Sequence, residues 1–506
     1  MFNSERIASR FLFSISFNII RGVFSFLAGL YIAKGLGPVE YGNFTFLLGS
    51  FIAIRQLIDL GTSSAFFTFI SQKKQSKLFY LIYFGWQLVQ LIIVIIIIYT
   101  VFPQSWISHI WQGQNNYRIL IAFFASFMMN NLWFTTTSIA ESIRKSIMIQ
   151  FINMAIMIIH FIIIYYLLNF SSISVDIIFY LISGEYIIAI LISAYILNSK
   201  IQFEKSKIIS LNDIIHEYFK YCAPLIVLAF ISFGYHFSDR WFLQKFSGSM
   251  EQGLYAISAK FSMVSLVATA SIINIYWKEI AESFEDRNFT KIKYLYKSTT
   301  RGLFFIGVFI ACLVIPWSKE IIFVMLGEKY LGASIPLTIM FFYPIHQSLG
   351  QINGSTFMAT GMTKESVIIG NIFLAISIPI VYLLIAPPHY KIPGFDLGAI
   401  GVAYKMVGLQ LIAVNVQSYY LSYKFKFKFD WIYQPVNIIV FLLFSYFLKL
   451  YLPSIINGIS EEYYRIFLSF SVVSFYSLFS ILYVYLFPSM VGQTRATLKS
   501  YINIFK

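Results

Sequence analysis

Long apolar runs, separated by short polar connections, recur along the whole chain of 506 residues. We count fourteen runs that are long enough, at about 20 residues each, to cross a hydrocarbon core of roughly 30 Å as a helix. The first run is longer than a signal-peptide core of roughly 7–15 residues, so we expect it to be retained as a helix. The predicted spans are 11–33, 44–70, 79–101, 118–139, 147–169, 175–197, 217–238, 253–276, 301–318, 334–357, 366–386, 398–422, 432–452 and 465–487.

Composition supports a helical membrane protein. Hydrophobic residues make up 58% of the chain and charged residues only 12%, and the mean hydropathy is +0.74. No soluble domain of this size has so little charge. Cys222 and Cys312 both lie in apolar runs and offer neither a disulfide framework nor a metal-binding spacing. The sequence therefore predicts an all-α polytopic membrane protein without a metal site.

Positive charge is distributed unevenly between alternate loops. With the N-terminus in the cytoplasm, about 24 Lys and Arg residues fall on the cytoplasmic side and about 9 on the far side, as the positive-inside rule requires. We therefore expect both termini in the cytoplasm, and much of the net charge of +15 reflects topology rather than binding of nucleic acid. The cytoplasmic set includes Lys73, Lys74, Lys77, Arg144, Lys145, Lys200, Lys205, Lys207, Arg287, Lys291, Lys293, Lys297, Lys424, Lys426, Lys428, Arg495, Lys499 and Lys506.

Two short segments, KGLGPVEYGNF (34–44) and KFSGSMEQGLY (245–255), resemble each other at an offset of 211 residues. Each follows the first span of a six-span block, which favours duplication over coincidence between short glycine-rich loops. Six-span units share one orientation, so a pseudo-two-fold axis along the membrane normal would relate them. The identities are Lys34 with Lys245, Gly37 with Gly248, Glu40 with Glu251, and Gly42 with Gly253.

The repeat predicts the domain organisation. Residues 1–210 would form an N-terminal lobe of spans 1–6, and residues 211–423 a C-terminal lobe of spans 7–12. Residues 424–506 would add spans 13 and 14 and a cytoplasmic tail.

Few charges remain within the spans once loop residues are set aside. A charge at the bilayer centre costs about 2.5–3.5 kcal/mol even on a mild insertion scale, so these side chains should face protein or water. Arg55 and Asp59, four residues apart in span 2, can form an intrahelical pair, which is the structural alternative to a functional role. Arg21 and Lys260 have no acid three or four residues away, so an anionic ligand would serve as their partner. The other charged candidates are Arg240, Lys405, Glu185 and Asp239.

Glu185 lies near the centre of span 6 without a cation three or four residues away. It suits a site that couples transport to protons or sodium ions. His160 has a simpler alternative, a hydrogen bond to a neighbouring group. The amides in mid-span either meet sugar hydroxyls or form hydrogen bonds between helices; they are Asn130, Asn131, Gln347, Gln351 and Asn353.

Two stretches carry a family resemblance: GLGPVEYGNF with the following LIDLGTSSAF, and SDRWFLQKFSGSMEQGLYAISAKF (238–261). They resemble the polysaccharide-transport branch of the multidrug/oligosaccharidyl-lipid/polysaccharide (MOP) exporter superfamily, and the second is similar to the signature that opens the second lobe in Wzx-type O-antigen flippases. The resemblance covers the whole chain in topology, although its specific motifs occupy only these stretches. It implies two six-helix lobes around a central cavity lined mainly by spans 1, 2, 7 and 8.

The resemblance also implies a function. Polysaccharide members of the family move undecaprenyl-pyrophosphate-linked oligosaccharides across the bacterial inner membrane by alternating access, and they are transporters rather than enzymes. Related lipid II flippases carry essential cations on spans 1, 2 and 8, and Arg21, Arg55 and Lys260 sit at similar places. Lys260 keeps the charge of an arginine but loses its bidentate fork.

The implied roles cover the remaining candidates. Arg21, Arg55 and Lys260, with Arg240 and Lys405, would bind the pyrophosphate. Coupling to H⁺ or Na⁺, or gating, would fall to Asp59, Glu185, Asp239 and His160, and no other cofactor is expected. The expected partners are the lipid-linked oligosaccharide, membrane lipid and the polysaccharide polymerase machinery.

Three other functions remain open. A drug or cation antiporter of the same superfamily would need acids and aromatics in its cavity, whereas several cations are predicted here. A lipid II flippase proper would differ mainly in being essential for viability. A membrane polymerase or ligase usually carries a large loop on the far side, and the longest such loop here, 102–117, has only roughly 16 residues.

Overall fold

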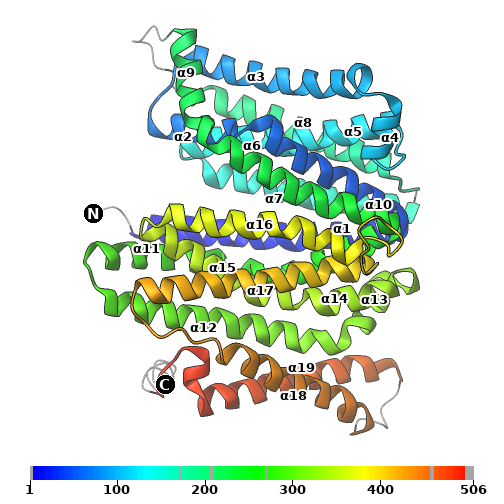
Figure 1. Ribbon diagram of the computed structural model, residues 1–506, viewed down its shortest axis with the longest axis vertical. Coiled ribbons are helices and arrows are strands. Elements are labelled where there is room, and N and C mark those ends of the chain that lie inside the picture. Colours follow the sequence, from blue (N-terminus) through cyan, green and yellow to red (C-terminus); the bar gives the residue numbers. More distant parts are fainter. Residues whose placement is uncertain are drawn as a thin grey trace. The chain divides into compact units, whose positions relative to one another are not determined.

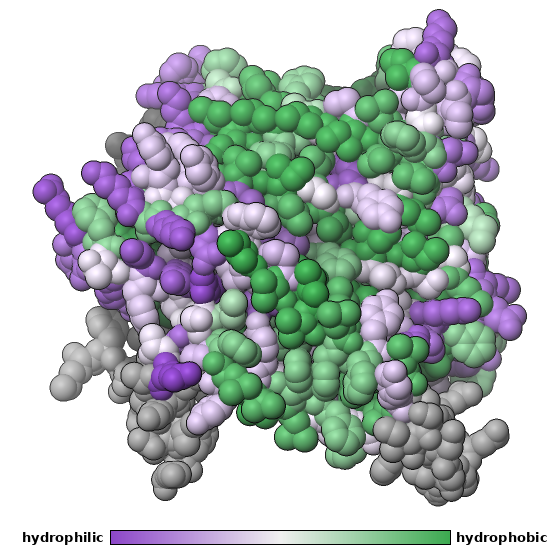
Figure 2. Space-filling view, turned by 60° about the horizontal axis from the view of Figure 1, so that its bottom comes forward, coloured by the Kyte–Doolittle hydropathy of each residue, from purple (hydrophilic) through white to green (hydrophobic). Residues whose placement is uncertain are grey.

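The computed structural model describes residues 4–170, 172–201, 203, 210–268, 270–455 and 461–495. Within these ranges the chain forms helices and turns and no strand, as expected. Ten helical segments of the described chain are long and apolar enough to cross a membrane. Figure 2 shows apolar side chains gathered across the middle of one face and polar side chains toward its left and right edges. Of the predicted cytoplasmic cations, Lys205, Lys207, Lys499 and Lys506 lie outside the described residues.

The chain divides into two compact units. Unit 1 comprises Met1–Ala256 and Leu374–Ala399, and unit 2 comprises Ile257–Phe373 and Ile400–Lys506. The predicted division into lobes at residues 210 and 423 stays a prediction.

Unit 1 is a bundle in which α1 packs along α7, with Phe17 against Phe151 and Phe24 against Phe161 (Figure 1). A π-helical turn, Met128–Leu132, joins α5 to α6. The helices of unit 1 are α1 (Ser4–Asp59), α2 (Thr62–Gln72), α3 (Lys77–Ile96), α4 (Gln104–Ile110), α5 (Asn116–Phe127), α6 (Trp133–Ser142), α7 (Ser146–Phe170), α8 (Val175–Asn198), α9 (Leu211–Cys222) and most of α10 (Ile226–Ser262).

Each of the two repeated segments lies at a sharp kink that joins two helices, as expected for a connection between the first two spans of a block. Gly37 interrupts α1 with φ 73° and ψ 169°, and Gly248 interrupts α10 with φ 83° and ψ 178°. Only glycine adopts this conformation at low cost. Pro38 is tolerated because it starts the next helical stretch, where its missing N–H needs no partner. The same kink at aligned residues confirms the repeat at this point.

The two kinked segments also contact each other reciprocally. A Cβ atom at Gly42 would collide with the carbonyl oxygen of Ser249, and a Cβ atom at Gly253 would collide with the carbonyl oxygen of Pro38. Because Ser249 and Gly253 follow Pro38 and Gly42 by 211 residues each, the contact relates the repeats symmetrically. The backbones cross here at a distance that only glycine allows.

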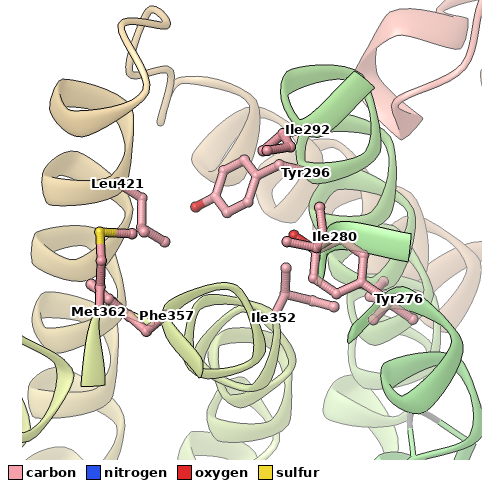
Figure 3. Packing of buried hydrophobic residues seen from close by; sticks show 9 residues of the cluster. Tyr276, Ile280, Ile292, Tyr296, Ile352, Phe357, Met362 and Leu421 are labelled. Carbon is pink, nitrogen blue, oxygen red and sulfur yellow. The ribbon is translucent and has the colours of Figure 1, made fainter. Parts of the chain in front are cut away.

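Unit 2 is built around α12 and α15, which pack on each other and on α11. Figure 3 shows Tyr276 and Tyr296 pointing into their shared apolar core with Ile280, Ile352 and Phe357. The helices are α11 (Ala270–Glu285), α12 (Phe289–Val314), α13 (Ser318–Leu326), α14 (Ser334–Met340), α15 (Phe342–Ala359), the first part of α16 (Thr363–Ile385), most of α17 (Gly398–Lys424), α18 (Tyr433–Ile455) and α19 (Glu461–Leu486).

Candidate functional site

Arg55 lies near the end of α1, in the membrane-spanning part of unit 1. Its guanidinium carbon is 5.1 Å from the centre of the Phe134 ring on α6. It shares with Gln90 and Asn131 the lining of a pocket of about 10 Å³, close to the space that one water needs. No carboxylate of the described chain lies within 4.0 Å of the guanidinium nitrogens. The charge is therefore available to an anion.

Asp59, four residues further on, is engaged elsewhere. One carboxylate oxygen accepts hydrogen bonds from the Thr62 hydroxyl at 2.9 Å and the Ser63 N–H at 3.0 Å, and the other accepts from the Ser63 hydroxyl at 2.8 Å. The chain breaks between α1 and α2 at Leu60 and Gly61, both with positive φ. Asp59 thus caps α2 across this break, and a direct pair with Arg55 is not formed.

A polar face of α3 supports this region, and it was not predicted. Tyr83, Gln87 and Gln90 are buried on one side of the helix. The Gln87 amide donates to the Thr135 hydroxyl at 2.6 Å, and the Gln90 amide donates to the Ile58 carbonyl at 3.3 Å. The spacing of tyrosine and glutamines at i, i+4 and i+7 in an apolar run was the signal that could have found it.

Arg240 lies in α10, just beyond the end of the predicted span 217–238. Its NH1 group donates to the His236 carbonyl at 3.4 Å. Its guanidinium packs on the backbone of α1 at Gly49, where a Cβ atom would collide with Nε. Asp239 precedes it and is half-buried. Gly49 therefore sets the position of the Arg240 charge.

His160 of α7 and Glu185 of α8, two separate candidates, meet in unit 1. His160 Nδ1 lies 2.8 Å from Glu185 Oε2, and the side chains are only 9% and 8% exposed. Glu185 Oε1 is buried without a hydrogen-bond partner among the residues described. An unsatisfied buried acceptor of this kind costs free energy. Arg21, exposed on α1, interacts electrostatically with Tyr186, the residue after Glu185.

The two remaining cations belong to unit 2. Lys260 is half-buried near the end of α10 and forms no ion pair within 4.0 Å in the described part of the chain. Lys405 of α17 is 2% exposed, and its Nζ lies 3.8 Å from the sulfur of Met406. Arg21, Arg55 and Arg240 lie in unit 1, so the predicted substrate-binding residues are divided between the units.

Three of the mid-span amides, Asn131, Gln347 and Asn353, form hydrogen bonds between helices, whereas Asn130 bonds to Ser126 four residues before it. Asn131 donates to the Gln90 side chain at 3.3 Å. In unit 2, Asn353 accepts from the Tyr296 hydroxyl at 2.7 Å and donates to the Val414 carbonyl at 2.9 Å. These contacts match the structural alternative for such residues, which membrane bundles use widely.

Comparison with known proteins places the fold. No protein-family model and no curated protein matches the chain. The lipid II flippase MurJ, in an inward closed conformation, matches with a TM-score of 0.66 at 18% identity, over 94% of this chain and 99% of the flippase. An inward-facing multidrug resistance MATE transporter of the MOP superfamily matches with a TM-score of 0.59 at 15% identity, over 81% and 99% of the two chains. The fold is that of MOP-superfamily transporters.

The two kinds of transporter differ in how much of the C-terminal part of this chain they match. A MOP-superfamily transporter from Pyrococcus furiosus, with a TM-score of 0.52 and 13% identity, covers 83% of this chain, as against 94% for MurJ. The match to MurJ leaves about 30 of the 506 residues of this chain uncovered. Helices α18 and α19 have 23 and 26 residues, so together they are longer than the uncovered part. The likeness to MurJ therefore extends into this C-terminal pair.

Proposed function

We propose that the protein flips a polyprenyl-pyrophosphate-linked oligosaccharide, an O-antigen or related surface polysaccharide repeat unit, between the leaflets of the bacterial inner membrane. The observation that carries this proposal concerns Arg55, which lies in a membrane-spanning helix. Its guanidinium contacts an aromatic ring and forms no ion pair with a carboxylate of the described chain. The fold shared with a lipid II flippase supports the same class of cargo.

The chemistry of such a cargo explains the cations. A pyrophosphate is multiply charged, and removing it from water is prohibitively costly unless other charges replace the water. The planar fork of Arg55 suits two oxygens of one phosphate group at once. Arg21 and Lys260 would add charge as the cargo passes, with Arg240 and Lys405 as further contacts, while the polyprenyl tail stays in lipid.

The His160–Glu185 pair supports coupling to an ion gradient. A proton or sodium ion that binds Glu185 would neutralise a buried carboxylate, and release on the other side of the membrane would restore it. Asp59 and Asp239 remain candidates for gating. Asp59 makes three hydrogen bonds across the break between α1 and α2, so a change of these partners would alter the break.

A lipid II flippase is the second candidate, since MurJ shares the fold over 94% of this chain. A MATE-type drug antiporter is disfavoured, because a cationic drug would be repelled by Arg55. These functions differ in phenotype. Loss of a lipid II flippase stops growth, whereas loss of a polysaccharide flippase leaves viable cells that lack long surface glycan.

Deletion of the gene tests the proposal. We expect viable cells that lack surface glycan and accumulate the lipid-linked repeat unit, and rescue by the wild-type gene. Lethal deletion would favour the lipid II flippase. Normal glycan with new sensitivity to cationic drugs would contradict the proposal and favour the antiporter.

A further inference from the structure

Three cations form a stripe along one face of α12. Lys293, Lys297 and Arg301 follow one another at intervals of four residues, so they share a side of the helix. Each step advances about 6 Å along the axis. Beyond Arg301 the helix is apolar for the rest of its length. The stripe therefore runs from the charged end of α12 to the beginning of its membrane-spanning part.

The stripe opens onto a pocket of about 190 Å³ within unit 2. Lys428 from the segment between α17 and α18 faces the same pocket, as do the aromatic side chains of Phe427 and Tyr433. The pocket is larger than a water site by an order of magnitude and has room for a phosphate group. Tyr296 forms part of the pocket wall. Its hydroxyl donates a hydrogen bond to the buried Asn353 at 2.7 Å, which fixes the side chain.

Arg301 forms the buried end of this pocket. It is 6% exposed, it donates hydrogen bonds to the Asp430 carboxylate and the Ser489 carbonyl, and its guanidinium carbon lies 4.8 Å from the Tyr433 ring centre. Described residues thus engage two of the five N–H donors of the guanidinium in hydrogen bonds. Asp430 fixes the side chain in place and leaves donors for a ligand.

The electrostatic balance favours an anion. The pocket has four cations, Lys293, Lys297, Arg301 and Lys428, and one carboxylate, Asp430. In the described part of the chain the three lysines form no ion pair within 4.0 Å. The first residue of α18, Tyr433, lines the pocket, so the positive end of that helix dipole lies there as well.

We propose that this pocket binds the phosphate group of an anionic membrane lipid, at a site separate from Arg55. Arg301 would engage phosphate oxygens at the buried end, while Lys297 and Lys428 would hold the headgroup at the surface. A lipid phosphate fits the position of the pocket better than a soluble phosphate compound, because Arg301 lies where α12 becomes apolar, which is the level of the headgroups of a bilayer. The inference does not depend on which cargo the protein carries.

Titration of the detergent-purified full-length protein with dioleoylphosphatidic acid tests the inference, with thermal stabilisation as the readout. The variant Lys297→Gln/Lys428→Gln removes two pocket charges and leaves Arg301 in place. We expect it to bind phosphatidic acid roughly tenfold or more weakly than wild type, because each surface lysine contributes substantially to anionic-lipid binding. The matched control is Lys424→Gln/Lys426→Gln, which makes the same charge change at the end of α17 and just after it, close to Lys428 in sequence but outside the pocket lining.

The control variant should bind phosphatidic acid like wild type, and dioleoylphosphatidylcholine should stabilise all three proteins weakly and equally. Equal losses in the two variants would mean general attraction to a basic surface and would overturn the site. Stabilisation by millimolar inorganic phosphate, without any by phosphatidic acid, would overturn the lipid assignment. An unchanged affinity in Lys297→Gln/Lys428→Gln would overturn the pocket itself.

Discussion

Arg55 and Arg118 are two arginines of the same unit with opposite surroundings. Arg118 of α5 donates from Nε to Asp176 at 2.9 Å and from NH1 to Glu40 at 3.4 Å, and so ties α5 to α8 and α1. Arg55 contacts an aromatic face and lies beside neutral amides, and in the described part of the chain it forms no ion pair within 4.0 Å. A charge with two acidic partners stabilises the bundle, whereas the charge without an ion-pair partner is the one that we propose for the cargo. Both residues are arginines, so the residue type does not show which one is structural; the presence or absence of acidic partners does.

An acid placed beside Arg55 should make it resemble Arg118. Asn131→Asp is nearly isosteric and lines the same small pocket. A carboxylate about 4 Å from a guanidinium attracts it by on the order of 4 kcal/mol at an effective dielectric constant of about 20. Even half of this would weaken competing phosphate binding by more than tenfold. We expect surface glycan to fall to the level of the deletion strain, with normal protein abundance by immunoblot.

The variant Asn131→Ser, which removes the amide without adding a charge, controls for loss of the hydrogen bond to Gln90. If Asn131→Asp alone kept full glycan, Arg55 would not bind the cargo through its charge.

The position of Arg240 offers a test of intermediate size. Gly49→Ala places a methyl group where the guanidinium packs, and the flexible side chain must move. We expect a several-fold loss of glycan export with little change in thermal stability. Gly22→Ala is the matched control on the same helix, since nothing lies within 4 Å of its added Cβ. Equal export by both variants would remove Arg240 from the proposed site.

The smallest effect is expected at a solvent-exposed ion pair. Lys291 lies 2.8 Å from Glu279, and its hydrogen bond and charge lower the pKa of that carboxyl below the ordinary value. A lowered folded-state pKa stabilises the protein above the unfolded-state pKa, and this stability is lost as the pH falls through the folded-state pKa. Glu279→Gln should therefore lower the melting temperature only slightly near neutral pH, and the difference should vanish in acid. A difference that grew on acidification would contradict this sign.

Much of the architecture was predictable because the bilayer restricts it. Apolar runs near 20 residues, with polar gaps between them, predicted a helical membrane protein. The aligned Gly37 and Gly248 predicted a repeat, and both are kinks with the same backbone conformation. The connections at these points are very short, because Pro38 at the start of a helical stretch lets the chain resume a helix at once.

The partners of the charged side chains were less accessible to sequence reasoning. His160 and Glu185 are 25 residues apart, and only the packing of α7 on α8 brings them to 2.8 Å. Asp59 could have been placed from the sequence, since DLGTS offers glycine for a break and hydroxyls for a cap. Phe134, whose ring lies over Arg55, follows a π-helical turn that no local pattern predicted.

The most direct test measures surface glycan in the deletion strain carrying wild type, Arg55→Ala or Arg118→Ala, with protein abundance matched. The account predicts no long surface glycan with Arg55→Ala and near-normal glycan with Arg118→Ala, because loss of the partly exposed Arg118 pairs costs only about 1 kcal/mol of stability. Normal glycan with a well-expressed Arg55→Ala variant would contradict the claim that this unpaired arginine binds the cargo.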